Sequence, residues 1–307
     1  MQKIKINAYA KLNLTLKVLG QRPDGYHDID SVFHTISLHD QLTISSRKDG
    51  RIILKCSDPS LPTDGSNLAY RAAVTLRELA IKKYPDKKLL GVTIALKKNI
   101  PVGAGLGGGS SDAAAVLLGL KKLWKLDKIS PAALKKAAAS LGSDVPFFLS
   151  GGTAHVTGRG EKVRPVSCKK GYHFVLVYPG FPVSTAWAYK NFKKIKNELT
   201  KGHKFSKMLL KSCGSGKPAV DISRFFINDL EPAVIPAHPS ISKVKADLLK
   251  AGALSSMMSG SGSSVFGLFP GPGSAKSAYS KISQIWPRCF LAHSVSSGKR
   301  SDKFILR

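Results

Sequence analysis

Apolar and polar residues alternate strictly at the beginning of the chain. Every even position from Ile4 to Val18 is apolar, and this period of two predicts a β-strand. Lys11 and Asn13 occupy odd positions, so they share the opposite, polar face of that strand. At the usual rise per residue their side chains stand about 6 to 7 Å apart and point into the same space.

Beyond this strand the pattern predicts further strands and helices. Pro-Asp-Gly in residues 22–28 predicts a turn, and short apolar runs between turn residues predict strands. Amphipathic segments that follow a capping residue predict helices. The expected strands are 31–38, 41–45, 91–96, 172–179, 253–258, 265–269 and 289–296. The expected helices are 66–83 with Ser66 as cap, 110–124 with Ser110 or Ser111, 130–142 with Ser130, one that begins at Ser184 or Thr185, 239–250 and 274–286.

The order of these elements changes near residue 150. A glycine-punctuated hairpin comes first, and a second layer of strands and helices follows it. Such an arrangement predicts an α+β sandwich. A chain of 307 residues has the length of roughly two domains, which we expect at 1–160 and 161–307, with a soft boundary because no linker separates them.

Composition places the chain among ordinary globular proteins. Hydrophobic residues make up 43% and charged residues 22%, which excludes a disordered or fibrous protein. The four cysteines are far apart, without zinc-ligand spacing, and are expected to be reduced thiols. We find no signal peptide and no apolar segment of transmembrane length, so we expect a cytoplasmic protein without a membrane partner. The cysteines are Cys56, Cys168, Cys213 and Cys289.

The charge is strongly positive, at +29. Such a field attracts polyanions, including nucleotides, nucleic acid and acidic surfaces. Much of the excess lies in residues 190–217, where nine lysines stand against one glutamate and few aromatic residues could stack on bases. A solvated face is the simpler interpretation of this segment, and a partner for it stays open.

The segment GAGLGGGSSDAAA, residues 103–115, has five glycines in its first seven positions and then becomes helix-forming. Glycines before a helix suit an anion-binding loop, because backbone N–H groups can crowd a phosphate there. The segment satisfies G-x-G-x-x-G, but no acidic residue follows at the end of a second strand, which disfavours dinucleotide binding. It lacks the lysine of a Walker A loop, and the chain lacks the protein-kinase motifs. The sequence therefore predicts a nucleotide loop of a third kind.

Three motifs together resemble the GHMP kinases. The segment PVGAGLGGGSSDAAA is similar to the second signature of that family, KLNLTL to the first and MMSGSGSSVFGLF to the third, and they occur in the right order. Residues 8–33 and the segment LGSDVPFFL are similar in particular to members that act on a cytidine-diphosphate-linked methylerythritol. The resemblance covers nearly the whole chain.

The resemblance implies a fold, a reaction and two cofactors. The fold would join an N-terminal half like domain 2 of ribosomal protein S5 to a C-terminal ferredoxin-like α/β sandwich. ATP and the acceptor would meet in the cleft between the halves, with Mg²⁺ as the second cofactor. The γ-phosphoryl group would pass to the 2-hydroxyl of the cytidine-diphosphate-linked acceptor, in the methylerythritol phosphate route to isoprenoids. The protein would work as a monomer or homodimer.

The resemblance also implies roles for particular residues. Asp144 would take the proton from the acceptor hydroxyl, and Lys11 would keep Asp144 ionised and balance charge near the phosphate. Asn13, Asp144, Tyr26, His27 and Tyr189 would bind the acceptor, with the rings and the histidine recognising cytosine. The ligands of Mg²⁺ stay open. ATP would bind to Pro101, Val102, Gly103, Ala104, Gly105, Leu106, Gly107, Gly108, Gly109, Ser110 and Ser111.

Three other functions remain as alternatives. A homoserine- or mevalonate-type kinase would share the loop, but Tyr26 and His27 argue against its small acceptor. A nucleic-acid-binding module would explain the positive charge, yet the chain has no aromatic stacking motif of the RNA-binding type. A catalytically inactive sensor is disfavoured because Lys11 and Asp144 are both present.

Overall fold

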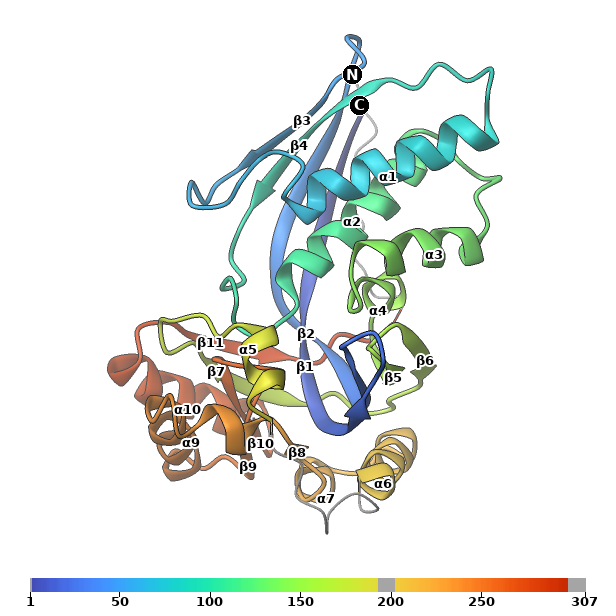
Figure 1. Cartoon of the computed structure of the whole chain (residues 1–307). Helices are drawn as coiled ribbons and strands as arrows, with labels where there is room; N and C mark the ends of the chain where they lie inside the picture. The colour runs from blue at the N-terminus through green and yellow to red at the C-terminus, as the bar shows by residue number, and fades with distance from the viewer. Residues whose placement is uncertain (1, 193–201, 298–307) are drawn as a thin grey trace.

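The computed structural model describes residues 2–192 and 202–297, so residues 193–201 of the lysine-rich segment lie outside it. Two β-sheets with helices packed against them confirm the predicted α+β class. Strands β3 and β4 with helices α1 to α3 form the upper part of Figure 1, the second sheet with α9 and α10 lies in the lower part, and β1 and β2 run from one to the other. In the described ranges no helix is long and apolar enough to cross a membrane.

The first sheet has seven strands in the order β3-β4-β2-β1-β8, and β5 pairs with both β2 and β6. The segments 31–38 and 41–45, expected as separate strands, are parts of one long strand, β2. The hairpin of β5 and β6 extends this sheet to Val166, and the short β8 joins it from the C-terminal sequence, parallel to β1. The strands are β1 (Lys3–Gln21), β2 (His27–Arg47), β3 (Ile52–Cys56), β4 (Gly91–Lys97), β5 (Thr153–Gly158), β6 (Lys162–Val166) and β8 (Ile227–Asn228).

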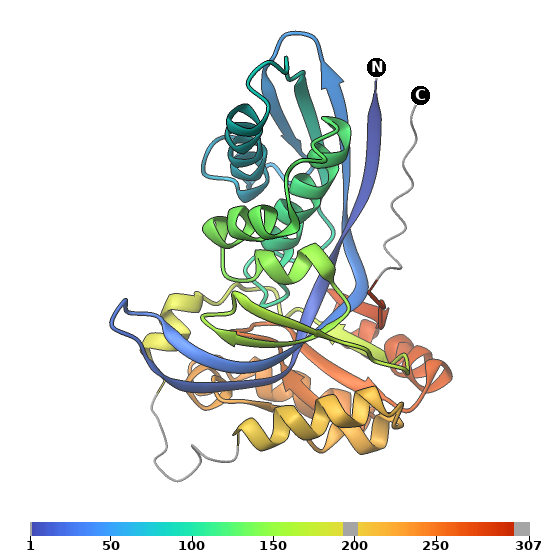
Figure 2. The ribbon, with the colours of Figure 1, turned by 90° about the vertical axis from the view of Figure 1, so that its right-hand side faces the viewer.

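Strands β1 and β2 form a long antiparallel hairpin that runs through both parts of the molecule (Figures 1 and 2). The even residues of β1 are buried, as the alternation predicts. The polar odd face is buried too from Lys11 to Lys17. The glycine loop and residues 259–260 lie over Lys11 and Asn13, and Thr15 and Lys17 pair with Ser206 and Asp229. Lys11 and Asn13 are only 4% and 2% exposed. Near its start β1 buries only its even face, whereas from Lys11 to Lys17, where the N-terminal and C-terminal parts meet, both of its faces are buried.

Four helices cover the first sheet, and their caps differ partly from expectation. Asn67, not Ser66, caps α1, because the Ser66 hydroxyl donates to Asp64 instead. Ser130 caps α3 as predicted. Helix α2 begins at Gly108, before the expected Ser110 or Ser111, and its N-cap is a glycine that offers no side-chain hydrogen bond. The helices are α1 (Leu68–Lys83), α2 (Gly108–Leu123), α3 (Pro131–Leu141) and α4 (Val145–Ser150).

The second sheet has the ferredoxin-like order β11-β7-β10-β9, and every neighbouring pair is antiparallel. Helices α9 and α10 pack on one face, while residues of β1, β2 and α6 share an apolar cluster with the other. The strands are β7 (His173–Val177), β9 (Ser255–Met258), β10 (Val265–Phe269) and β11 (Cys289–His293). The helices of this part are α5 (Thr185–Lys190), α6 (Gly202–Gly214), α7 (Ala219–Ser223), α8 (Glu231–Val234), α9 (Ser240–Lys250) and α10 (Pro272–Ile285).

Candidate active site

A cleft of about 1280 Å³ opens where the two parts of the molecule meet. Its walls come from β1, the turn after β1, the glycine loop, the start of α4 and helix α5. Apart from Ser111, all the predicted site residues line it, although they come from five separate stretches of sequence. The fold therefore brings the predicted nucleotide loop and the predicted acceptor residues into one space.

The glycine loop runs directly into the N-terminus of α2. Gly105 and Gly107 have φ values of +75° and +71°, which side chains rarely adopt. The first N–H groups of any α-helix have no partner within the helix, and in α2 the N-cap Gly107 offers them no side-chain hydrogen bond either. Unpaired N–H groups and the positive end of the helix dipole form an anion site.

Backbone from the C-terminal part supports this loop from the other side. A Cβ atom on Gly105 would lie 1.9 Å from the carbonyl oxygen of Ser259, so only glycine fits there. The Ser259 hydroxyl donates to the Gly105 carbonyl at 3.0 Å, and the Ser264 N–H donates to the Ala104 carbonyl at 3.2 Å. The third motif thus holds the second in place.

Lys11 lies at the centre of the cleft. Its ammonium donates to Asn13 Oδ1 at 2.5 Å and to the Gly105 carbonyl at 2.9 Å, and it lies 3.9 Å from Asp144 Oδ2. Burial lowers the pKa of Lys11, and Asp144 opposes that shift. Asn13 is oriented in turn, since its side-chain amide donates to the Ser31 hydroxyl at 3.0 Å. An ammonium, an amide and a carboxylate therefore meet beside the glycine loop.

Aromatic and imidazole side chains form the opposite end of the cleft. His27 and Tyr189 stack on each other, with ring centroids 5.1 Å apart and an interplanar angle of 29°. Tyr26 is 54% exposed, and the Arg159 guanidinium lies 4.8 Å from its ring centroid. Burial lowers the pKa of His27, so its imidazole is neutral at pH 7 and offers one donor and one acceptor. In this arrangement Tyr189 pairs with His27 and not with Tyr26.

Three charged residues form a buried cluster beside the glycine loop, and sequence reasoning did not predict that they meet. The Lys98 ammonium donates to Asp112 Oδ2 at 2.8 Å and also to Asp40. Burial raises the pKa of Asp112 to about 7, with Lys98 opposing and Asp40 adding to the shift. The other oxygen of Asp112 is buried without a hydrogen-bond partner.

The lining of the cleft also includes Leu61, Pro62, Leu68 and Val102, which add apolar surface. A loop with a few apolar residues gives no sequence signal of its own. Only the folded structure shows that these residues line the cleft, where apolar side chains suit a nucleoside.

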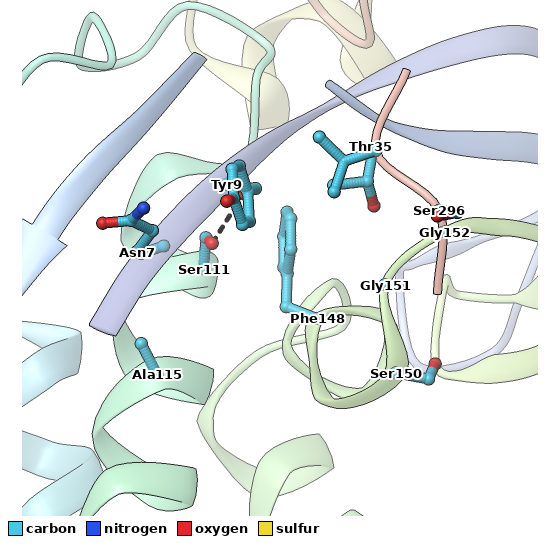
Figure 3. A pocket seen from close by; sticks show the side chains of 12 residues that line it. Asn7, Tyr9, Thr35, Ser111, Ala115, Phe148, Ser150, Gly151, Gly152 and Ser296 are labelled. Atoms are coloured by element: carbon cyan, nitrogen blue, oxygen red, sulfur yellow. Dashed lines mark hydrogen bonds between the residues drawn. The ribbon is translucent and has the colours of Figure 1, made fainter. Parts of the chain in front are cut away.

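Ser111 differs from the other predicted nucleotide-loop residues. Its side chain points away from the cleft, and its hydroxyl donates to the carbonyl of Tyr9 at 2.7 Å (Figure 3). There it lines a cavity of about 10 Å³ between β1, α2 and α4, together with Tyr9 and Phe148. That volume is about the space of one water molecule, so it is too small for a substrate. Only the backbone of Ser111 lies at the helix N-terminus.

The fold and the cleft define a nucleotide-dependent small-molecule kinase, and the comparisons agree. Residues 67–152 match the GHMP kinases N terminal domain, and residues 203–288 match the GHMP kinases C terminal domain. The chain belongs to the GHMP kinase family.

The relatives give a more specific picture. The chain is 44% identical to a 4-diphosphocytidyl-2-C-methyl-D-erythritol kinase of Chlorobium phaeobacteroides, over 88% of this chain and 90% of that one. It is 42% identical to the protein of that name in Pelodictyon phaeoclathratiforme, with the same coverage.

Two solved structures have nearly the same similarity of fold to this chain but differ in sequence identity. A crystal structure of 4-(cytidine 5'-diphospho)-2C-methyl-D-erythritol kinase matches with a TM-score of 0.75 and 32% identity, over 95% of this chain and all of that one. Homoserine kinase from Cytophaga hutchinsonii matches with a TM-score of 0.76 but 18% identity, over 97% and 96%. The shared fold therefore does not distinguish the acceptor, whereas the sequence does.

Proposed function

We propose that this protein transfers the γ-phosphoryl group of ATP to the 2-hydroxyl of 4-diphosphocytidyl-2-C-methyl-D-erythritol, giving the 2-phosphate and ADP in the methylerythritol phosphate route to isoprenoids. One observation carries the proposal. Lys11, Asn13 and Asp144 lie between a phosphate loop and a group of aromatic side chains in a single cleft. A donor bound at one end and an acceptor bound at the other would meet at these three residues.

Asp144 is the proposed general base. Its side chain is 30% exposed at the start of α4, so a hydroxyl can reach it from the cleft. As the hydroxyl oxygen bonds to the γ-phosphorus, its proton passes to Asp144, and the bond from phosphorus to the β,γ-bridging oxygen breaks to release ADP. Phosphoryl transfer depends mainly on positioning and on neutralising charge.

Lys11 is proposed to neutralise negative charge where the phosphate and Asp144 meet. Its ammonium already contacts the loop carbonyl of Gly105 and lies within ion-pair distance of Asp144. Because the Lys11 side chain is buried, its charge is little screened by water and acts strongly on a transferring phosphoryl group. Asn13 fixes the position of the ammonium and can donate to the acceptor.

Mg²⁺ is proposed as the metal that accompanies ATP. Across the described residues no group of three or more histidine, cysteine or acidic side chains could hold a metal alone. Mg²⁺ suits such a site, because it binds through nucleotide phosphates with only one or two protein carboxylates. Asp112, which has one buried oxygen without a hydrogen-bond partner, and Ser110 both line the cleft and fit this requirement. When bound, the ion would neutralise charge on the β- and γ-phosphates.

The aromatic end is proposed to bind the cytosine base. Tyr26 and Tyr189 offer ring faces, and neutral His27 offers a donor and an acceptor to the polar edge of the base. Homoserine and mevalonate have no base for these side chains to bind. This end of the cleft therefore favours a nucleotide-linked acceptor over the other acceptors of the family.

The setting of the reaction is also a proposal. We expect the enzyme in the cytoplasm, and its four cysteines are free thiols, as suits a reducing compartment. A monomer or a homodimer would suffice, since the cleft is formed within one chain. Nucleic acid is not required as a partner.

An acceptor panel with radiolabelled ATP tests the proposed function. The purified protein is incubated with cytidine-diphosphate methylerythritol, homoserine, mevalonate or phosphomevalonate, and labelled product is counted. We expect label transfer to the cytidine-linked acceptor alone. Transfer to homoserine or a mevalonate derivative, with none to the cytidine-linked compound, would contradict the assignment.

A further inference from the structure

We infer that Arg159 is a specificity-determining residue that binds the diphosphate of the acceptor. This inference rests on the proposed function, because it presupposes a nucleotide-linked acceptor. It concerns the turn Gly158–Arg159–Gly160 between β5 and β6, which the sequence patterns predicted only as a glycine-punctuated hairpin.

The turn is shaped to present one arginine. Gly158 and Gly160, which flank it, have φ values of +69° and +119°. Glu161 fixes the turn, since its carboxylate accepts from the Arg159 N–H at 2.7 Å. A Cβ atom on Gly158 would lie 2.7 Å from that carboxylate, so the backbone approaches closely there. Arg159 therefore projects from a well-defined backbone position.

Arg159 lies between the two functional ends of the acceptor site. Its guanidinium covers the ring of Tyr26, the proposed cytosine platform, at 4.8 Å. The next residue, Gly160, packs beside the proposed base, because a Cβ there would lie 3.4 Å from Asp144 Oδ1. In the proposed acceptor the diphosphate joins the cytidine to the sugar alcohol. A base on Tyr26 and a hydroxyl at Asp144 would place that diphosphate near Arg159.

The charge of Arg159 is available for a ligand. It lines the cleft and forms no ion pair with any carboxylate in the part of the chain that the structure describes. The guanidinium also acts on Asp24: burial raises the pKa of that carboxyl, but the backbone N–H of Tyr26, Arg22 and, last in order, Arg159 together lower it. A planar guanidinium binds phosphate oxygens in pairs, which makes it a better diphosphate ligand than an ammonium.

Calorimetric titration with cytidine and with cytidine diphosphate tests this role, in the presence of a saturating non-hydrolysable ATP analogue that blocks the nucleotide site. We expect Arg159→Ala to raise the Kd of cytidine diphosphate about 10- to 100-fold, the effect of losing hydrogen bonds to a charged group. Cytidine, which lacks the phosphates, should lose less than about 3-fold. Arg159→Lys should recover part of the loss. Arg164→Ala, which removes an exposed arginine of β6 outside the cleft, should leave both constants unchanged.

The outcomes separate the inference from the proposed function. Equal weakening of cytidine and cytidine diphosphate would show that Arg159 only supports Tyr26, and an unchanged Kd for both would remove it from the site. Either result overturns the inference while the acceptor assignment stands. If the wild-type protein binds neither compound, the cytidine-linked acceptor itself is wrong, and the inference fails with it.

Discussion

The two ends of the cleft are built in different ways. At the nucleotide end, backbone packs on backbone, since the Ser264 N–H donates to the Ala104 carbonyl and Gly105 has no room for a Cβ atom beside the Ser259 carbonyl. At the acceptor end, side chains from the turn after β1, the β5–β6 turn and α5 gather around open space, and Tyr26 is half exposed. Backbone geometry is hard to vary and side chains are easy to vary. The fold thus fixes the kind of donor and leaves the acceptor to a few side chains.

The largest effect on activity is expected at Asp144, where the donor and the acceptor would meet. We predict that Asp144→Asn lowers kcat by about 10² to 10⁴-fold, the range for loss of a general base and roughly 3 to 5 kcal/mol of barrier. Steady-state assays with both substrates saturating measure this, with circular dichroism to confirm folding. An unchanged kcat in a folded variant would remove Asp144 from the mechanism.

Gly107→Val should damage the nucleotide end alone. A branched side chain cannot easily adopt the φ of +71°, and its Cβ would lie 2.8 Å from the Phe148 ring. Strain and displacement of this size should raise the Kd of ATP by about 100-fold. The control is Gly252→Val, which places the same side chain at a φ of +97° with open space around it, after α9. That variant should keep normal ATP affinity, and a normal Kd for Gly107→Val as well would refute the phosphate loop.

Tyr26→Ala should damage the acceptor end alone. Stacking of a base on an aromatic ring is worth about 1 to 3 kcal/mol, so the Kd of the acceptor should rise roughly 5- to 150-fold. ATP affinity should stay nearly constant. Tyr26→Phe keeps the ring and should bind the acceptor almost normally. If the phenylalanine variant binds as poorly as the alanine variant, the hydroxyl and not the stacked ring is the important group.

The smallest effect concerns the pH dependence of the free energy of unfolding, through the buried His34. His34 of β2 is buried between the hydroxyls of Thr153 and Ser294, and burial lowers its pKa from 6.5 to about 4. An unfolded chain therefore binds a proton more readily than the folded one between these values. Stability is full above pH 6.5 and falls as pH drops toward 4, by about 1 kcal/mol at pH 5.5 relative to pH 7.

Urea unfolding of the wild type and His34→Gln at pH 7 and pH 5.5 isolates this contribution, because glutamine does not titrate. The wild type should lose about 1 kcal/mol more than the variant over this interval. Equal losses would mean that His34 takes up a proton as easily in the folded protein as in the unfolded chain.

Local patterns in the sequence predicted the elements better than the site. The alternation in β1 predicted that Lys11 and Asn13 share one face, and the glycines predicted the phosphate loop before α2. Asp144, by contrast, is a loop residue whose role came only from the family resemblance. A local pattern cannot show that a second part of the chain covers the polar face of β1, so the burial of Lys11 was not predicted.

The cluster of Lys98, Asp40 and Asp112 illustrates the same limit. Lys98 pairs with residues 58 and 14 positions away, on another strand and on a helix. Ion pairs at such separations depend on sheet register and helix packing, which no single segment specifies. The stacking of Tyr189 on His27 is a similar case, because the two residues come from different parts of the molecule.

The independence of the two ends is tested most directly by titrating ATP and the cytidine-linked acceptor, each separately, into the wild type, Gly107→Val and Tyr26→Ala. We predict a crossed result: Gly107→Val weakens ATP binding and spares the acceptor, whereas Tyr26→Ala weakens the acceptor and spares ATP. If each variant weakens both ligands to the same degree, the cleft is a single cooperative site, and the division into a backbone-built donor end and a side-chain-built acceptor end is contradicted.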